Sequence, residues 1–128
     1  GIEPDPRLSV EAQSSEQAGH DAATALLDSG VPFDAIFAAS DLIAMGAIGA
    51  LRDRGRSVPD DVAVVGFDDI AAAAHFIPPL TTVQQDTHRA ADMPVDNLLK
   101  MTSGEPVESA LIEPRLVIRG SCGGSAGA

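Results

Sequence analysis

The sequence has 128 residues, 45% of them hydrophobic, and a formal net charge of −11. This length and apolar content support one folded domain rather than a disordered chain. The acidic excess argues against direct binding of nucleic acid phosphates, and no stretch approaches the roughly 20 apolar residues of a membrane span. The single cysteine, Cys122, has no partner for an internal disulfide.

The N-terminal part of the chain predicts an extended piece followed by a helix. Ser14, with Gln17 three residues later, resembles a capping box. In this motif the serine side chain caps the helix, and the glutamine side chain bonds to the backbone N–H of the serine. Apolar residues follow at helical spacing until Gly30, a typical residue at a helix C-terminus. Pro32 then prevents the helix from continuing.

A strand and a second helix are predicted next. The short apolar run at 35–39 indicates a buried strand, and the polar pair after it can cap a helix at about 42–54. Gly46 and Gly49 lie inside that helix rather than in the turn before it. They therefore favour close helix packing over a dinucleotide-binding turn.

The clearest strand pattern lies at 62–65, where four apolar residues indicate a strand buried on both faces. The remaining elements are a strand at 80–85, a helix at about 86–102, and strands at 109–112 and 116–119. Pro94 should bend the predicted helix, or lie in the first turn of a helix that starts late. Residues 121–128 are rich in small side chains and should form a flexible tail.

The alternation of strands and helices predicts an α/β fold, with a mostly parallel, Rossmann-like sheet in three layers and helices on both faces. Ligands of such sheets bind beyond the carboxyl ends of the strands. Two predicted strands end there in polar pairs, Ser40-Asp41 and Asp68-Asp69, whose hydroxyl and carboxylate groups suit a sugar or a nucleoside. Asp41 and Asp69 can also be explained as caps of the segments that follow them, which leaves Asp68 as the candidate ligand contact.

Other chemistries have less support. A receiver-type phosphotransfer site would need a lysine after a later strand, and the only lysine, Lys100, falls within a predicted helix. Paired carboxylates also occur in glycosidases, but nothing else in the sequence resembles a catalytic cleft. The histidines lack partners at metal-ligand spacing and no nucleophile elbow is present, so we expect no metal, no cofactor and no catalysis.

Three blocks of sequence carry a family resemblance: DAIFAASDLIAMGA at 34–47, VPDDVAVVGFDD at 58–69 and PPLTTVQQ at 78–85. In their order and spacing they resemble the effector-binding domain of LacI/GalR-type transcriptional repressors. The resemblance implies a lobe of the periplasmic-binding-protein type I fold, without enzyme activity, in a cytoplasmic repressor. A sugar or related polar metabolite would then alter operator affinity. The alternatives are a periplasmic sugar-binding protein for transport and, with less support, a carboxylate-based enzyme.

The resemblance also implies how the chain is divided and paired. Residues 1–84 would form the C-terminal lobe, 85–104 would cross to the N-terminal lobe, and 105–120 would return as strands of the C-terminal lobe. The family's helix-turn-helix head is not in this sequence, so operator DNA would be contacted only through such an N-terminal head. Met45 and Phe76 match positions that pack across a homodimer interface in relatives, although both also suit an ordinary core.

The candidate ligand contacts follow from position within the family pattern. Asp68 resembles the carboxylate that binds the effector, Ser40 stands in place of a common asparagine, and Gln85 faces the cleft where the chain crosses between lobes. Ser14 stands where relatives often carry an aromatic ring that stacks on the ligand. We therefore expect no stacking at that position, and this departure from the family pattern counts against a typical sugar.

Overall fold

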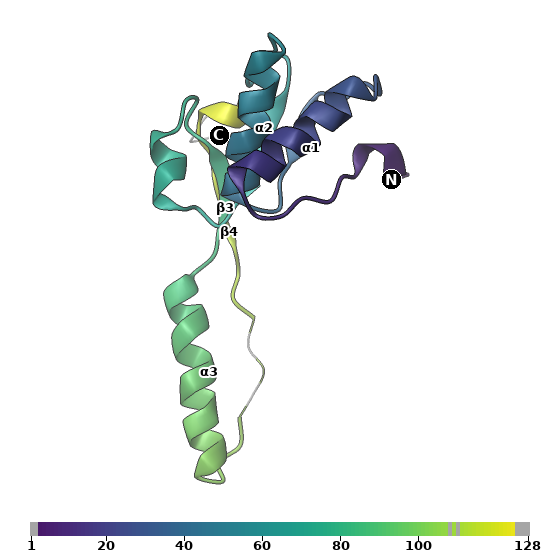
Figure 1. Cartoon of the computed structure of the whole chain (residues 1–128). Coiled ribbons are helices and arrows are strands. Elements are labelled where there is room, and N and C mark those ends of the chain that lie inside the picture. Colours follow the sequence, from purple (N-terminus) through teal and green to yellow (C-terminus); the bar gives the residue numbers. More distant parts are fainter. Residues whose placement is uncertain (1–2, 108, 110, 125–128) are drawn as a thin grey trace.

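The computed structural model describes residues 3–107, 109 and 111–124 of the protein. Within them lie α1 (Glu16–Asp28), β1 (Ala35–Phe37), α2 (Asp41–Asp53), β2 (Ala63–Phe67), β3 (Thr81–Gln84), α3 (Thr87–Thr102) and β4 (Arg115–Val117), with the 3-10 turns η1 (Pro6–Leu8), η2 (Ala71–His75) and η3 (Gly120–Cys122). The strands are ordered β1-β2-β3-β4 in one sheet, parallel except for β4, which runs antiparallel to β3. Figure 1 shows β3 and β4 next to each other above α3. The prediction of an α/β fold with a mostly parallel sheet is confirmed.

The core forms where β2 packs against α2. Val62 and Val64 are buried together with Leu51 of α2 and with Leu80, which lies immediately before β3. Within β2, Val64 is buried, whereas Ala63, Val65 and Phe67 are only half-buried. The face of β2 that packs against α2 is therefore fully covered, and the predicted burial of the strand on both faces is only partial on the second face.

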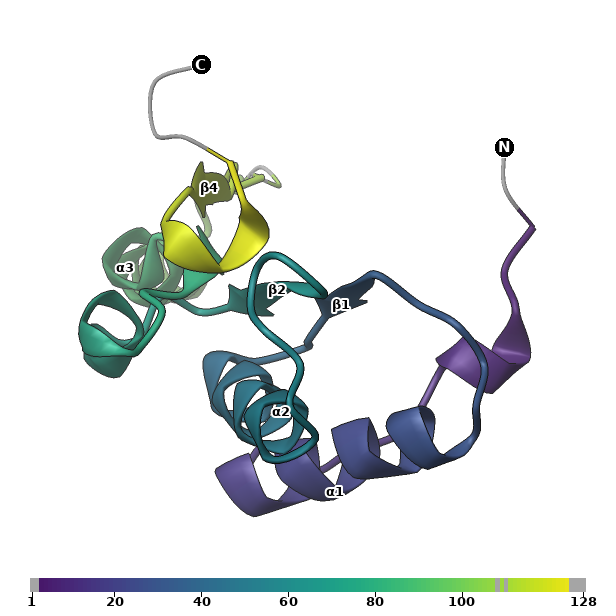
Figure 2. The ribbon, with the colours of Figure 1, turned by 90° about the horizontal axis from the view of Figure 1, so that it is seen from above.

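Helices α1 and α2 lie on the same side of the sheet, and η3 contacts β2 and β3 on the other side (Figure 2). The sequence predicted helices on both faces, so the second layer is thinner than expected in the described part of the chain. The two helices approach each other closely through glycines. A Cβ atom on Gly46 would overlap the carbonyl oxygen of Glu16, and one on Gly19 would overlap the carbonyl of Ile43.

We expect Gly46→Ala to destabilise the protein by about 3 kcal/mol, because its methyl group meets backbone that cannot move aside without separating the helices. Gly49→Ala is the matched control on the same helix. Its Cβ would lie 3.6 Å from the His20 ring, an ordinary contact, so alanine should be neutral or stabilise by up to about 1 kcal/mol through helix propensity. Urea unfolding followed by circular dichroism measures both. Equal effects of the two substitutions would contradict the close-packing interpretation of Gly46.

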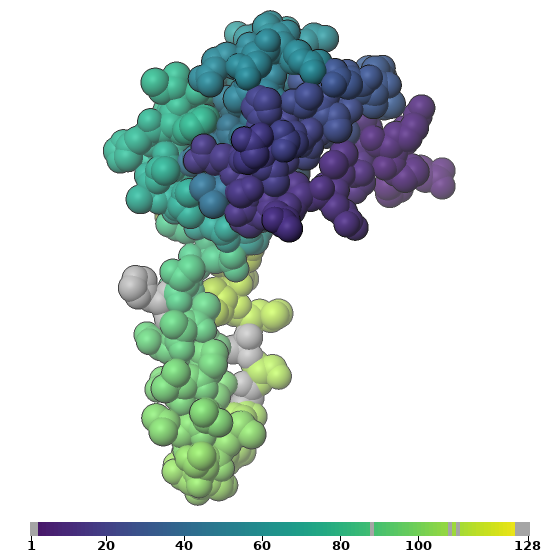
Figure 3. All heavy atoms as spheres, in the orientation of Figure 1, coloured from purple at the N-terminus to yellow at the C-terminus, as the bar shows by residue number. Residues whose placement is uncertain are grey.

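Helix α3 stands apart from the rest of the molecule as an arm (Figures 1 and 3). It runs unbroken from Thr87 through Pro94, so it does not start late, and Asp86 caps it by accepting a hydrogen bond of 3.0 Å from the Arg89 backbone N–H. Its exposed side chains include Val95, Leu98, Leu99 and Met101. Several exposed apolar residues on one helix are typical of a contact surface. The assignment of 85–104 to a second lobe stays a prediction.

Three local predictions need correction. The N-cap of α1 is Ser15, which accepts a bond of 3.2 Å from the Ala18 N–H, and not its neighbour Ser14. No strand forms at the described residues 109, 111 and 112, while residue 110 lies outside the described part; the later prediction corresponds to β4. Ser121 does not belong to a flexible tail, because it is fully buried and bonded to two strands, while residues 125–128 are not described.

Candidate functional site

The parallel strands bring three of the predicted contacts to one edge of the sheet. Ser40 follows β1, Asp68 follows β2 and Gln85 follows β3, each just past the carboxyl end of its strand. Parallel strands in register end at the same edge, and here β2 aligns with both neighbours. The polar groups singled out from the sequence therefore gather at the place where open α/β sheets bind ligands.

The hydroxyl groups of Ser14 and Ser40 meet at this edge. Ser40 is the N-cap of α2, with its Oγ accepting a bond of 3.3 Å from the Ile43 N–H. The Ser14 hydroxyl donates to the same oxygen at 3.0 Å, across 26 residues of sequence. Ser40 is buried whereas Ser14 is exposed, so Ser14 is the hydroxyl of this pair that a ligand can reach.

Asp68 and Gln85 are also brought together. The Gln85 side-chain amide donates a hydrogen bond of 3.1 Å to Asp68 Oδ1, and both residues are exposed. The backbone N–H of Asp68 donates to the carbonyl of Val83 at 2.9 Å, which continues the β2–β3 ladder one residue beyond β2. Asp68 thus has an anchored backbone and a carboxylate that is open to solvent.

Asp41 has a structural role that the sequence did not indicate. It was expected to cap α2, but Ser40 is the cap and Asp41 is the first helical residue. Its fully buried carboxylate accepts hydrogen bonds from the Thr82 hydroxyl at 2.5 Å and from the Ile70 N–H at 2.8 Å. Gly66 leaves room for it, since a Cβ there would overlap Asp41 Oδ1. Asp41 therefore ties β3 and the start of η2 to α2.

Asp69 was predicted to cap the segment after β2, and this prediction is wrong. The N-cap of η2 is Ile70, which makes no side-chain capping bond. The Asp69 carboxylate instead accepts bonds from Arg119 Nη2 at 2.6 Å and from Gln84 Nε2 at 2.9 Å. Arg119 lies 50 residues further along the chain. No local sequence pattern could have identified it as a partner.

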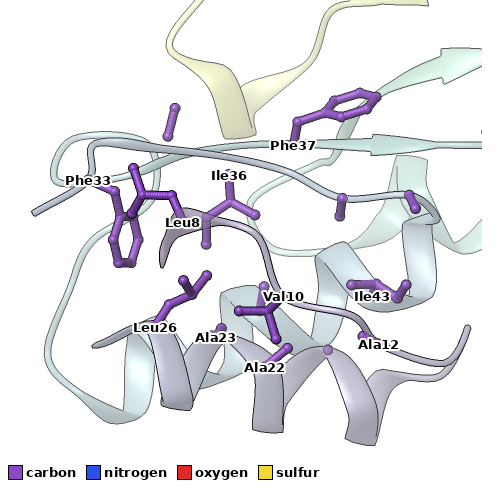
Figure 4. A pocket seen from close by; sticks show the side chains of 15 residues that line it. Leu8, Val10, Ala12, Ala22, Ala23, Leu26, Phe33, Ile36, Phe37 and Ile43 are labelled. Carbon is purple, nitrogen blue, oxygen red and sulfur yellow. The ribbon is translucent and has the colours of Figure 1, made fainter. Parts of the chain in front are cut away.

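An apolar groove of about 240 Å³ lies beside this edge, between β1, the segment at 8–12 and α1 (Figure 4). Side chains such as Val10, Leu26 and Phe33 line it, and none of the described lining residues carries a charged or amide group. A polar ligand needs placed hydrogen-bonding groups. The strand ends, not this groove, are therefore the candidate site.

Neither a membrane span nor a metal centre is found in the described part of the chain. None of its helices has the length and apolar character needed to cross a bilayer. No three side chains of His, Cys, Asp or Glu come together there in an arrangement that could hold a metal ion.

Comparison with known proteins finds relatives among transcriptional regulators. The family of periplasmic binding protein-like domains matches residues 1–122. The chain is 43% identical over 109 residues to an uncharacterized HTH-type transcriptional regulator of Streptomyces limosus, covering 84% of this chain and 30% of that protein. It is 39% identical over 123 residues to the HTH-type transcriptional regulator CelR of Thermobifida fusca, covering 94% of this chain and 36% of CelR. It thus spans about a third of the length of these relatives.

Solved structures agree with the sequence matches. A complex of the transcriptional regulator CelR with cellobiose has a TM-score of 0.87 at 38% identity, covering 94% of this chain and 37% of that one. A lac repressor dimer bound to operator and the anti-inducer ONPF has a TM-score of 0.84 at 34% identity, covering 88% of this chain and 40% of that one. These relatives are transcriptional regulators, not enzymes or transport proteins.

Proposed function

The chain belongs to the periplasmic binding protein-like family, in the form of the effector-binding domain of LacI-type transcriptional regulators, and from this premise we propose that it senses a sugar-like effector. One observation carries the proposal: an exposed carboxylate, Asp68, is paired with an exposed amide, Gln85, at the carboxyl ends of parallel strands. The pair offers hydrogen-bond acceptors and a donor to the hydroxyl groups of a sugar, and it lies at the end of the strands where open α/β sheets commonly bind ligands.

The chemistry of the site favours a polyhydroxylated ligand over an anion. A carboxylate only accepts hydrogen bonds, so Asp68 can receive two from neighbouring hydroxyls of a sugar ring. The Gln85 amide can donate and accept, and its bond to Asp68 would be exchanged for bonds to the ligand. Ser14 adds a hydroxyl that is already oriented by Ser40. With a net charge of −11, the chain as a whole also repels anionic ligands.

Effector binding would act on DNA through a change in conformation. β3 leads directly into α3, and β4 returns from it to the same sheet, so two adjacent strands connect the candidate site to the arm. We assign the arm, within residues 85–104, to a second lobe that closes over the ligand. A ligand that binds the closed arrangement more tightly shifts the population towards it, and with it the affinity of a helix-turn-helix head for operator DNA.

The same regulator would act as a cytoplasmic homodimer. Met45 and Phe76 line a shallow depression with Glu16, Gln17, His20 and Arg52 on the α1–α2 side of the sheet. Met45 is 3% exposed and belongs to the core, so Phe76 and the polar rim would make most of the contact. Sedimentation equilibrium of the full-length protein tests this, and a monomer at micromolar concentration would contradict it.

A thermal-shift screen of the full-length protein tests the sensing function. The panel should contain disaccharides, with cellobiose among them, monosaccharides and nucleosides. A ligand present at 100 times its Kd should stabilise the protein by about 2.7 kcal/mol and raise its Tm by a few degrees. A positive ligand should also change the affinity for operator DNA. If a ligand binds tightly with no effect on DNA affinity, the regulatory proposal fails.

A further inference from the structure

The turn that presents Asp68 has an unusual backbone. Asp68 has φ 108° and Asp69 has φ 54°, and among the described residues these are the non-glycine residues with positive φ. Residues with a Cβ rarely adopt this region, and two in succession are rarer still. Such a conformation persists only when surrounding contacts hold it, and it is often found at functional sites.

The contacts that hold the turn are made by Asp69. Its carboxylate accepts hydrogen bonds from Arg119 Nη2 at 2.6 Å and from Gln84 Nε2 at 2.9 Å, one on each oxygen. The side chains of Arg119 and Asp69 are only 19% and 11% exposed, so solvent screens the ion pair weakly. The Asp69 N–H also reaches Thr82 Oγ1 at 3.4 Å. Asp68, in contrast, makes one side-chain bond, to the exposed Gln85.

Arg119 is itself fixed to the start of β3. Its Nη1 donates to the carbonyl oxygen of Leu80 at 2.8 Å, and its backbone N–H donates to Thr81 Oγ1 at 2.8 Å. The guanidinium therefore bridges the beginning of β3 and the turn after β2. It does so from the segment after β4, which returns from the α3 arm.

We propose that Arg119 is a positioning residue for the effector site: by holding Asp69 it keeps the left-handed turn that aims the Asp68 carboxylate at the ligand. The inference rests on the proposed function. Arg119 does not contact the ligand and acts through Asp69. A lysine at this position keeps the charge but loses the planar fork that spans Leu80 and Asp69, so it should replace Arg119 only in part.

Crystal structures of the full-length protein and its Arg119→Gln variant test the turn directly, without a ligand. In the variant, we expect the turn at 68–69 to leave the positive-φ region or to adopt more than one conformation. A variant that stays folded with both φ values and the Asp68 carboxylate unchanged would overturn the inference. Arg56→Gln is the matched control, because Arg56 lies in the turn before β2, at the opposite end of that strand.

Titration calorimetry with cellobiose as the probe tests the link to binding. We expect Arg119→Gln to weaken binding about tenfold, because a displaced Asp68 carboxylate would lose about one charged hydrogen bond to the ligand. Arg119→Lys should weaken binding less. In an Asp68→Asn background, Arg119→Gln should add little, since both act on one carboxylate. If Asp68→Asn weakens binding and Arg119→Gln does not, the positioning role fails and the sensing function stands. If Asp68→Asn leaves the affinity for cellobiose unchanged, the proposed site fails. The crystal structures still decide the role of Arg119 in the turn.

Discussion

Replacing Asp68 with Asn is expected to weaken effector binding about 10- to 100-fold while leaving the free energy of unfolding nearly unchanged. A hydrogen bond to a charged group contributes about 1.5–3 kcal/mol, and the amide can accept from ligand hydroxyls through one oxygen only. Stability should not change, because the Asp68 side chain is exposed and its only side-chain bond is to the equally exposed Gln85. Calorimetry of the full-length protein with the ligand found by screening gives the affinity.

The matched control for this prediction is Asp60→Asn. Asp60 is also an exposed aspartate next to β2, but it lies before that strand and therefore at the opposite edge of the sheet. Its replacement should leave the affinity within about a factor of two. Equal effects of the two substitutions would indicate that general charge, and not a specific contact, attracts the ligand. The enzyme alternative makes a different prediction, namely turnover of the ligand that Asp68→Asn abolishes.

Replacing Asp41 with Ala is expected to destabilise the protein by about 2–5 kcal/mol. The carboxylate is fully buried and is the acceptor for both the Thr82 hydroxyl and the Ile70 N–H. Each buried donor left without a partner costs about 1–3 kcal/mol, and a cavity adds to this. Urea unfolding followed by circular dichroism measures the loss.

Two further variants separate the loss of the Asp41 hydrogen bonds from a general effect of losing an aspartate. Thr82→Val removes one donor to Asp41 and the long contact from the Asp69 N–H, but it keeps the Ile70 N–H bonded to Asp41. It should therefore cost less than Asp41→Ala, and the two should be non-additive. Asp34→Ala, an exposed residue before β1, should change stability by less than about 0.5 kcal/mol. Full additivity of Asp41→Ala and Thr82→Val would show that the two side chains do not act as a unit.

The buried carboxylate and the exposed one have opposite roles, although both follow a strand of the same sheet. Asp41 is shielded by α2 and β3 and satisfied by protein donors, so it contributes to stability. Asp68 lies past the end of β2, where no helix covers it, and its carboxylate remains available. One substitution should therefore change stability and the other affinity, and the pair of experiments distinguishes scaffold from site.

The sequence by itself determined the family, most of the strand and helix pattern, and the edge of the sheet at which the candidate site was predicted. The three blocks that resemble LacI/GalR-type domains are confirmed by the family match over residues 1–122 and by the structural matches. Ser40 and Asp68 could be placed together because parallel strands in register must end at one edge, whereas Gln85 was assigned to the site by the family resemblance. That inference needs only the order of the elements and the position of polar residues directly after each apolar run.

The tertiary structure alone decided which polar residues hold the scaffold and which remain free for a ligand. Asp41 bonds to groups 29 and 41 residues away, and Asp69 bonds to Arg119 across 50 residues. Local patterns report neighbours within about four positions, so both aspartates resembled helix caps. Even the choice between Ser14 and Ser15 as the cap of α1 is linked to a distant contact, because the Ser14 hydroxyl bonds to Ser40. Hydrogen bonds between segments far apart in sequence become visible only once the chain has folded and packed.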